Sequence, residues 1–248
     1  MFPIRDHNPS GRTPWVTWVL LVANIGIFLL TLPMQGDENL AFALFDTWGM
    51  VPERVSMGQD WSGILTSMFL HAGWMHLAGN MLFLWIFGDN MEDAFGHLGF
   101  ALFYLASGVA AALIQFAADP GSPIPMVGAS GAIAGVLGGY LLLYPKARVD
   151  VLLIIIIFFR IFPVPAWIML GLWFAFQFVG GFSAPGDEGG VAYWAHAGGF
   201  AAGFAMTVPL WLRLGGPGFW NRTHGLPPHP EATYPLAASR IPTVRRRR

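Results

Sequence analysis

Four polar residues interrupt long apolar stretches of the sequence: His76, Asn80, Ser130 and His196. Strongly polar groups inside membrane-crossing segments are costly, and they are treated first as functional candidates. A serine paired with a histidine can supply the nucleophile and the base of acyl-transfer chemistry. His76 and Asn80 are four residues apart, so they share a helical face, and both can donate hydrogen bonds to a developing oxyanion. The residue types therefore predict serine-dependent catalysis.

Ser130 occurs in the motif Gly128-Ala129-Ser130-Gly131, immediately before an apolar stretch. A serine hydroxyl needs a base to become a nucleophile, and glycines beside it let the backbone turn sharply and approach a substrate. Backbone N–H groups at a helix start lack intrahelical partners and could also bind an oxyanion. The alternative is a helix-capping serine in a glycine-rich turn. This motif by itself leaves both interpretations open.

His196 precedes Gly199 and Gly203, whose four-residue spacing lets a second helix approach closely. The stretch after Ser130 carries a matching set of glycines at 131, 135, 138 and 139. If these two faces pack, Ser130 and His196 come within hydrogen-bonding distance. The alternative is simple glycine packing, with the histidine bonded to a backbone carbonyl. No Asp or Glu lies in an apolar stretch to orient His196, so we predict a Ser–His dyad.

A metal site is the competing interpretation, because His71 lies five residues before His76. The spacing is not H-E-x-x-H, no carboxylate belongs to the pattern, and the chain has no cysteine. We therefore expect no metal and no cofactor, and we expect His71 to shape the loop before its helix.

The composition predicts an integral membrane protein. Of 248 residues, 55% are hydrophobic and 11% are charged, against about 25% charged in soluble domains. Apolar residues occur in blocks, and about 20 helical residues cross a bilayer core of about 30 Å. The fold expected is an all-α bundle of six transmembrane helices. Their approximate ranges are Trp15–Leu32, Trp74–Asn90, Leu98–Ala118, Ser130–Tyr144, Ala166–Phe182 and Tyr193–Leu212.

Three regions follow from these spans: an N-terminal tail (1–14), a membrane domain (15–214) and a disordered Pro- and Arg-rich tail (215–248). Residues 37–70 and 149–162 are expected to lie at the membrane interface. With both termini in the cytoplasm, all Lys and Arg residues except Arg54 fall inside, as the positive-inside rule requires. The four polar residues then lie near the extracytoplasmic face. We expect the membrane to be a prokaryotic plasma membrane.

Together the motifs His71-Ala72-Gly73-Trp74-Met75-His76-Leu77-Ala78-Gly79-Asn80, Gly128-Ala129-Ser130-Gly131 and Ala195-His196 with Gly199 and Gly203 resemble the rhomboid intramembrane proteases. The resemblance covers about residues 58–214. It implies a compact six-helix bundle that cleaves transmembrane substrates near the membrane surface without a cofactor. It also implies Ser130 as nucleophile, His196 as general base and then acid, and His76, Asn80 and the Ser130 amide as an oxyanion hole. The loop Ser183–Gly190 would cap the site.

Two departures from the family pattern are visible. An aromatic residue often follows the serine by four positions and packs beneath the histidine, whereas this chain has Ala134. The first loop often carries a Trp-Arg pair, whereas Trp61 is followed here by Ser62. We expect the second departure to change the loop rather than the activity.

Two other functions compete with a protease. One is a catalytically weak or inactive relative that binds transmembrane helices. The other is a small transporter or channel, for which Gln115 and Gln177 are candidate polar residues, although no continuous polar path is evident. The expected partners are transmembrane proteins and membrane lipid, with Arg245–Arg248 against anionic lipid. Nucleic acid is not an expected partner.

Overall fold

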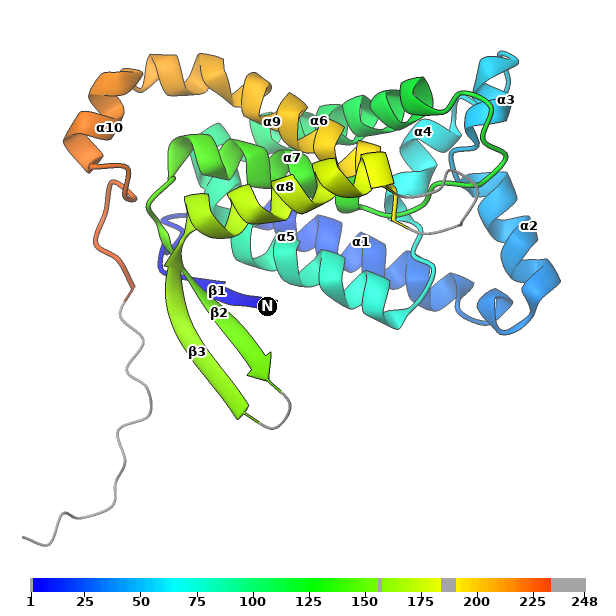
Figure 1. Ribbon diagram of the computed structural model, residues 1–248, viewed down its shortest axis with the longest axis horizontal. Helices are drawn as coiled ribbons and strands as arrows, with labels where there is room; N and C mark the ends of the chain where they lie inside the picture. The colour runs from blue at the N-terminus through cyan, green and yellow to red at the C-terminus, as the bar shows by residue number, and fades with distance from the viewer. Residues whose placement is uncertain (1, 156–157, 184–190, 233–248) are drawn as a thin grey trace, which may run out of the picture.

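The computed structural model describes residues 2–155, 158–183 and 191–232. Long helices occupy the six stretches that the sequence predicts as spans (Figure 1). Each begins within a residue of its expected start, because an apolar run bounded by Gly, Pro or acidic residues sets helix limits locally. These helices are α1 (Trp15–Thr31), α5 (Trp74–Phe95), α6 (His97–Ala118), α7 (Ser130–Leu143), α8 (Ala166–Ser183) and α9 (Tyr193–Arg213).

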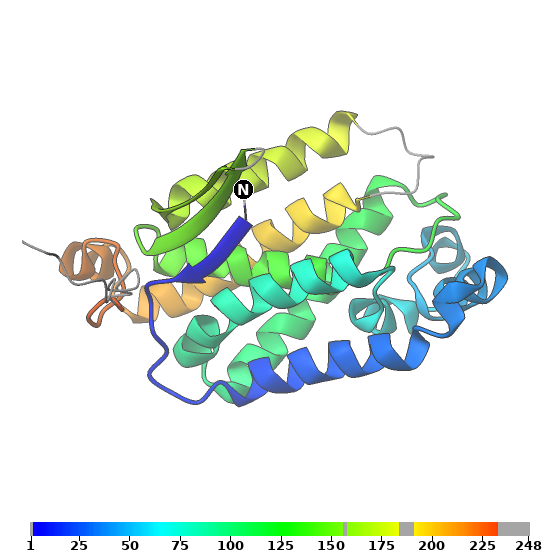
Figure 2. The same cartoon turned by 90° about the horizontal axis from the view of Figure 1, so that it is seen from below.

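Helix α7 lies at the centre of the bundle, in contact with α5, α6, α8 and α9 (Figure 2). Every residue from Gly131 to Tyr140 is buried. The contact between α7 and α9 is made backbone to backbone: a Cβ on Gly199 would collide with the carbonyl oxygen of Gly131, and a Cβ on Gly203 with that of Gly135. Small residues let helices approach this closely. Their packing places the start of α7 beside the first turn of α9.

The segment expected at the membrane interface folds into short helices at one end of the bundle (Figure 1). They are η1 (Met34–Gly36), α2 (Glu38–Trp48), α3 (Pro52–Ser56), α4 (Gly63–Thr66) and η2 (Ser67–Phe69). Asp37 caps α2 by accepting the amides of Asn39 and Leu40.

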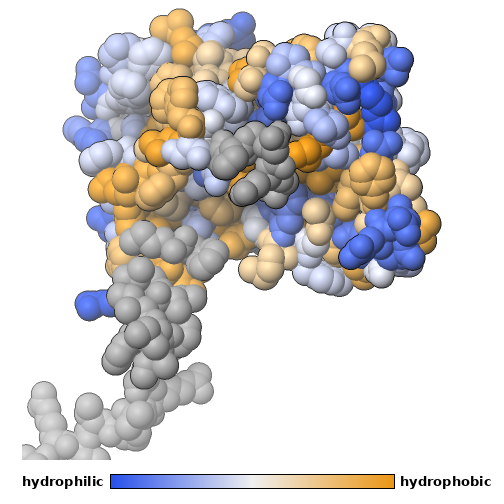
Figure 3. All heavy atoms as spheres, turned by 45° about the vertical axis from the view of Figure 1, so that its right-hand side comes forward, coloured by the Kyte–Doolittle hydropathy of each residue, from blue (hydrophilic) through white to orange (hydrophobic). Residues whose placement is uncertain are grey.

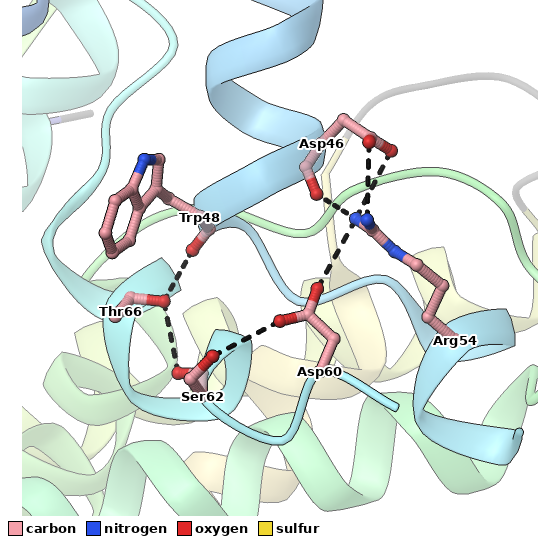
Figure 4. Close-up of polar contacts among 6 residues, drawn as sticks. All are labelled: Asp46, Trp48, Arg54, Asp60, Ser62 and Thr66. Atoms are coloured by element: carbon pink, nitrogen blue, oxygen red, sulfur yellow. Dashed lines mark hydrogen bonds and ion pairs between the residues drawn. The ribbon is translucent and has the colours of Figure 1, made fainter. Parts of the chain in front are cut away.

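Arg54 joins the parts of this segment (Figure 4). Its guanidinium bonds the backbone carbonyl of Asp46 and lies 3.2 Å from the Asp46 carboxylate and 3.5 Å from that of Asp60. Thr66 Oγ1 donates to the carbonyl of Trp48 over 2.7 Å. The loop without the Trp-Arg pair therefore has an arginine bridge of its own, supplied from α3.

The protein is mostly helical, as expected, but it is not all-α, because a three-stranded antiparallel sheet lies at the opposite end of the bundle (Figure 1). Its order is β1 (Phe2–Asp6), β2 (Arg148–Ile155) and β3 (Phe158–Pro165). The stretch expected to be interfacial is rich in β-branched residues, which favour strands. Pro163, opposite Asp150, and Pro165 are tolerated because β3 is an edge strand.

The first and last described segments of the chain meet at this sheet. Asp150 of β2 binds Arg5 at 2.7 Å and His7 at 2.9 Å, and the amide of Ala232 donates to the carbonyl of His7 over 3.0 Å. The expected disorder from residue 215 onward is also wrong in part, because α10 (Pro217–Thr223) buries Phe219 against the bundle. Residues 233–248 lie outside the described part of the chain.

Within the described ranges, two helices are long and apolar enough to cross a membrane, α6 and α8. Helices α1 and α7 are apolar but shorter. The count of six crossings and the orientation of the termini are therefore not confirmed. Large apolar side chains are nevertheless exposed on several helices, among them Leu30, Leu98 and Phe176 at 80%, 74% and 72%. On the face in Figure 3, apolar side chains lie between polar ones.

Candidate active site

Ser130 and His196 lie in contact at the end of the bundle that carries α2 to α4. Ser130 begins α7 and His196 is in the first turn of α9, and Ser130 Oγ lies 2.7 Å from His196 Nε2. The other ring nitrogen, Nδ1, lies 2.8 Å from Gln177 Oε1. An amide oxygen only accepts, so Nδ1 carries the proton and Nε2 is left to accept from the serine hydroxyl. This tautomer is the one that a general base requires.

A cavity of about 1090 Å³ opens over this pair and is lined by His76 and Asn80 of α5 as well as by Ser130 and His196. Asn80 is buried, and its Nδ2 has no acceptor among the described residues. Buried donors are nearly always paired in proteins, so one without a partner beside a cavity needs an explanation. A ligand oxygen in the cavity would supply the missing acceptor.

The turn before Ser130 depends on Gly128. Its φ of +128° is a conformation that side chains disfavour. A Cβ at this position would also overlap the ring of His76. Gly128 therefore leaves room for the His76 ring beside the turn that precedes Ser130.

The start of α7 adds backbone donors to the same place. The first hydrogen bond of the helix runs from the Ile133 amide to the Ala129 carbonyl over 3.0 Å. The amides of Ser130, Gly131 and Ala132 precede it, where a helix leaves N–H groups without intrahelical acceptors.

His71 is fully buried behind His76, and the two rings meet edge to face with centroids 5.1 Å apart. Burial, together with the nearby His76, lowers the pKa of His71 to about 4, so its ring is neutral at physiological pH. Gln35 Nε2 donates to the His71 carbonyl over 3.0 Å. His71 thus shapes the loop and supports the His76 ring. In the described ranges no three His, Cys, Asp or Glu side chains form a group that could hold a metal ion.

Two α8 residues complete the surroundings of His196, and the sequence alone connects neither of them with this histidine. Gln177 binds Nδ1, and the Trp173 ring lies 5.8 Å from the imidazole, tilted by 33°. The two are four residues apart, hence on one helical face. Gln177 is a polar residue in an otherwise apolar helix, and this could have marked it as part of the site. From the sequence it was instead a candidate for a transport path.

Gln115, the other candidate for that path, also lies at this end. Its Oε1 accepts the amide of Ala195 over 3.1 Å, at the start of α9. Both glutamines therefore serve the surroundings of one cavity. The expected cap, Ser183–Gly190, lies outside the described residues after its first position.

Comparison with known proteins identifies the fold's relatives. A family model described as the Rhomboid domain matches residues 58–213. RHOMBOID-like protein 5 of Arabidopsis thaliana is 29% identical over 56% of this chain and 55% of its own length. Rhomboid protease GluP of Bacillus subtilis is 35% identical over 52% of this chain and 24% of its own. Rhomboid protein 1, mitochondrial, of Saccharomyces cerevisiae is 35% identical over 70% of this chain and 51% of its own.

The chain spans about half the length of the curated relatives it matches first. One is a bacterial protein named as a protease, and others carry names that say only rhomboid-like. Some are named mitochondrial or chloroplastic, so the likeness does not support the expected prokaryotic plasma membrane.

Proposed function

Because the chain belongs to the rhomboid family, whose members are embedded in membranes, we propose that it is a serine endopeptidase that cleaves transmembrane helices. The observation that carries the proposal is the hydrogen bond of 2.7 Å between Ser130 Oγ and His196 Nε2, in a cavity at the end of an otherwise apolar bundle. A serine with a correctly protonated histidine is the minimum apparatus for acyl transfer.

In the proposed reaction, His196 Nε2 takes the hydroxyl proton as Ser130 Oγ attacks the scissile carbonyl carbon. The tetrahedral intermediate collapses when His196 returns this proton to the leaving amine, and an acyl ester remains on Ser130. His196 then deprotonates a water molecule that attacks the ester, and the second product leaves as the serine recovers its proton. Gln177 keeps the proton on Nδ1 throughout the cycle.

The negative oxygen formed in each step would lie between α5 and the start of α7. Asn80 Nδ2 is the donor that has no partner among the described residues, and His76 and Ser130 line the same cavity. One such donor typically contributes about 3–4 kcal/mol of transition-state stabilisation. The close-packing glycines, Gly128, Gly131, Gly199 and Gly203, hold these groups at their distances.

We further propose that residues 15–214 form the membrane domain, with six crossings and both termini in the cytoplasm. The contact between His7 and Ala232 supports an even number of crossings, because it joins the segment before the first long helix to the segment after the last one. Basic residues gather around that sheet and α10, whereas Arg54 lies at the other end. By the positive-inside rule, the sheet faces the cytoplasm and the cavity faces the opposite side.

The test uses the full chain in detergent and a model substrate with a single transmembrane helix. Wild type should cleave it, and Ser130→Ala and His196→Ala should each reduce cleavage to background while thermal unfolding is unchanged. A serine-directed fluorophosphonate should label wild type and not Ser130→Ala. Equal cleavage by wild type and Ser130→Ala would contradict the proposal.

An inactive or weak helix-binding relative is the second candidate, favoured by Ala134 and by relatives whose names say only rhomboid-like. It predicts that wild type is neither labelled nor active, yet still retains the model helix in co-purification. Ser130→Ala would then bind the helix as well as wild type does.

A further inference from the structure

We propose that Gln177 is the positioning residue of His196 and that, with Trp173, it supplies from α8 the support that Ala134 cannot supply from α7. The inference rests on the proposed protease function. It concerns two side chains of α8 that contact the ring of His196.

The hydrogen bond from Nδ1 to Gln177 selects one of two tautomers. If Oε1 were absent, the proton could move to Nε2, and the nitrogen facing Ser130 would be a donor instead of a base. No carboxylate replaces the amide: besides His196, the titratable side chains among the described residues lining the cavity are His76, Asp119 and Tyr193. A neutral acceptor therefore takes the place that a carboxylate has in a catalytic triad.

Trp173 supplies the aromatic packing against the His196 ring. Ala134 is buried with no ring to offer, and the tilted Trp173 ring covers the imidazole instead. It also lies 6.2 Å from Phe200, one turn after the histidine. An aromatic neighbour limits rotation of the imidazole, so the Nδ1 bond keeps its direction.

An aromatic seam, defined here as Phe174, Phe178 and Phe182 of α8 with Trp194 and Phe200 of α9, holds Gln177 in reach. Phe174 stacks on Phe200 at 4.7 Å, and Trp194 meets Phe178 at 6.0 Å and Phe182 at 4.9 Å. The buried residues of α8, Ala166 and Leu170, lie near its other end. The position of Gln177 therefore depends on these rings.

The experiment measures kcat, KM and the pH dependence of kcat for Gln177→Leu and Gln177→Glu in the full chain. Gln177→Leu should lower kcat about tenfold, the equivalent of one hydrogen bond of about 1.4 kcal/mol, with KM within twofold of wild type. Gln177→Glu keeps the shape and the acceptor, so it should retain kcat near wild type. Its carboxylate favours the imidazolium, so the acid limb of its profile should move to higher pH.

Phe176→Leu is the matched control, since this α8 side chain is 72% exposed and should leave both kcat and the profile unchanged. If Gln177→Leu is unstable, the isosteric Gln177→Glu serves as the test by itself. An acid limb of its kcat–pH profile at the same pH as in wild type would overturn the proposal. An unchanged kcat in a folded Gln177→Leu would also overturn it. These outcomes leave the protease function intact provided that Ser130→Ala is inactive, whereas activity in Ser130→Ala contradicts that function itself.

Discussion

Helix α9, which carries His196, contacts its neighbours α7 and α8 in two different ways. Helix α7 meets α9 through glycines, with backbone against backbone and almost no exposed surface. Helix α8 meets α9 through aromatic rings, and most of its own surface is exposed. The first contact has no room to adjust, whereas rings can tilt and slide. The distance between Ser130 and His196 is thus set by the rigid contact, and the orientation of the imidazole by the adaptable one.

The largest effect is expected from adding one methyl group to the rigid contact. Gly199→Ala places a Cβ against the Gly131 carbonyl, so α7 and α9 must separate. Such overpacking typically destabilises by about 1–3 kcal/mol, and the added separation should also weaken the Ser130–His196 hydrogen bond. Thermal unfolding and cleavage rate measure the two effects, and both should fall.

Gly171→Ala is the matched control for that change. This α8 glycine faces open space, and alanine is the better helix former by about 1 kcal/mol, so stability should hold or rise. If Gly199→Ala and Gly171→Ala lost equal amounts of stability, the α7–α9 contact would be no more rigid than the surroundings of Gly171 in α8.

A smaller effect, on kcat, is expected from a change in the aromatic contact between α8 and α9. Trp173→Leu removes the ring over the imidazole and leaves the Gln177 bond in place, so kcat should fall by roughly threefold to tenfold with little change in unfolding temperature. Trp173→Phe should recover most of the rate. A loss of stability as large as that of Gly199→Ala would show that Trp173 serves the fold rather than the histidine.

The smallest effect on catalysis is expected at the far end of α7, where Tyr140 donates to Asp6 of β1 over 2.7 Å. Burial raises the pKa of Asp6 to about 7, although this hydrogen bond opposes the rise. The folded state therefore holds a proton that the unfolded chain loses near pH 4, and stability falls as pH rises between about 4 and 7. Asp6→Asn should flatten that slope in unfolding measured across this range. An unchanged slope would assign the pH dependence to other groups.

Much of the fold could be predicted from the sequence, because the limits of the six long helices depend on local composition and on stop residues. The family resemblance is confirmed by the Rhomboid domain match over residues 58–213. The proximity of Ser130 and His196 followed from two glycine faces, each visible in one stretch of sequence. The sheet could not be predicted because β1 and β2 are about 145 residues apart in the sequence. The local sequence of each strand does not indicate which segment pairs with it.

The sequence by itself determined which six stretches become the long helices, which glycines permit close contact and which polar residues stand out in them. These properties depend on neighbours within a turn or two of helix. Only the tertiary structure decided that Gln177 accepts from His196, that the Trp173 ring lies beside the imidazole and that the Asn80 side chain keeps an unpaired N–H donor among the described residues. Such partners depend on how far each helix is rotated about its axis, and that rotation results from the packing of all the helices together.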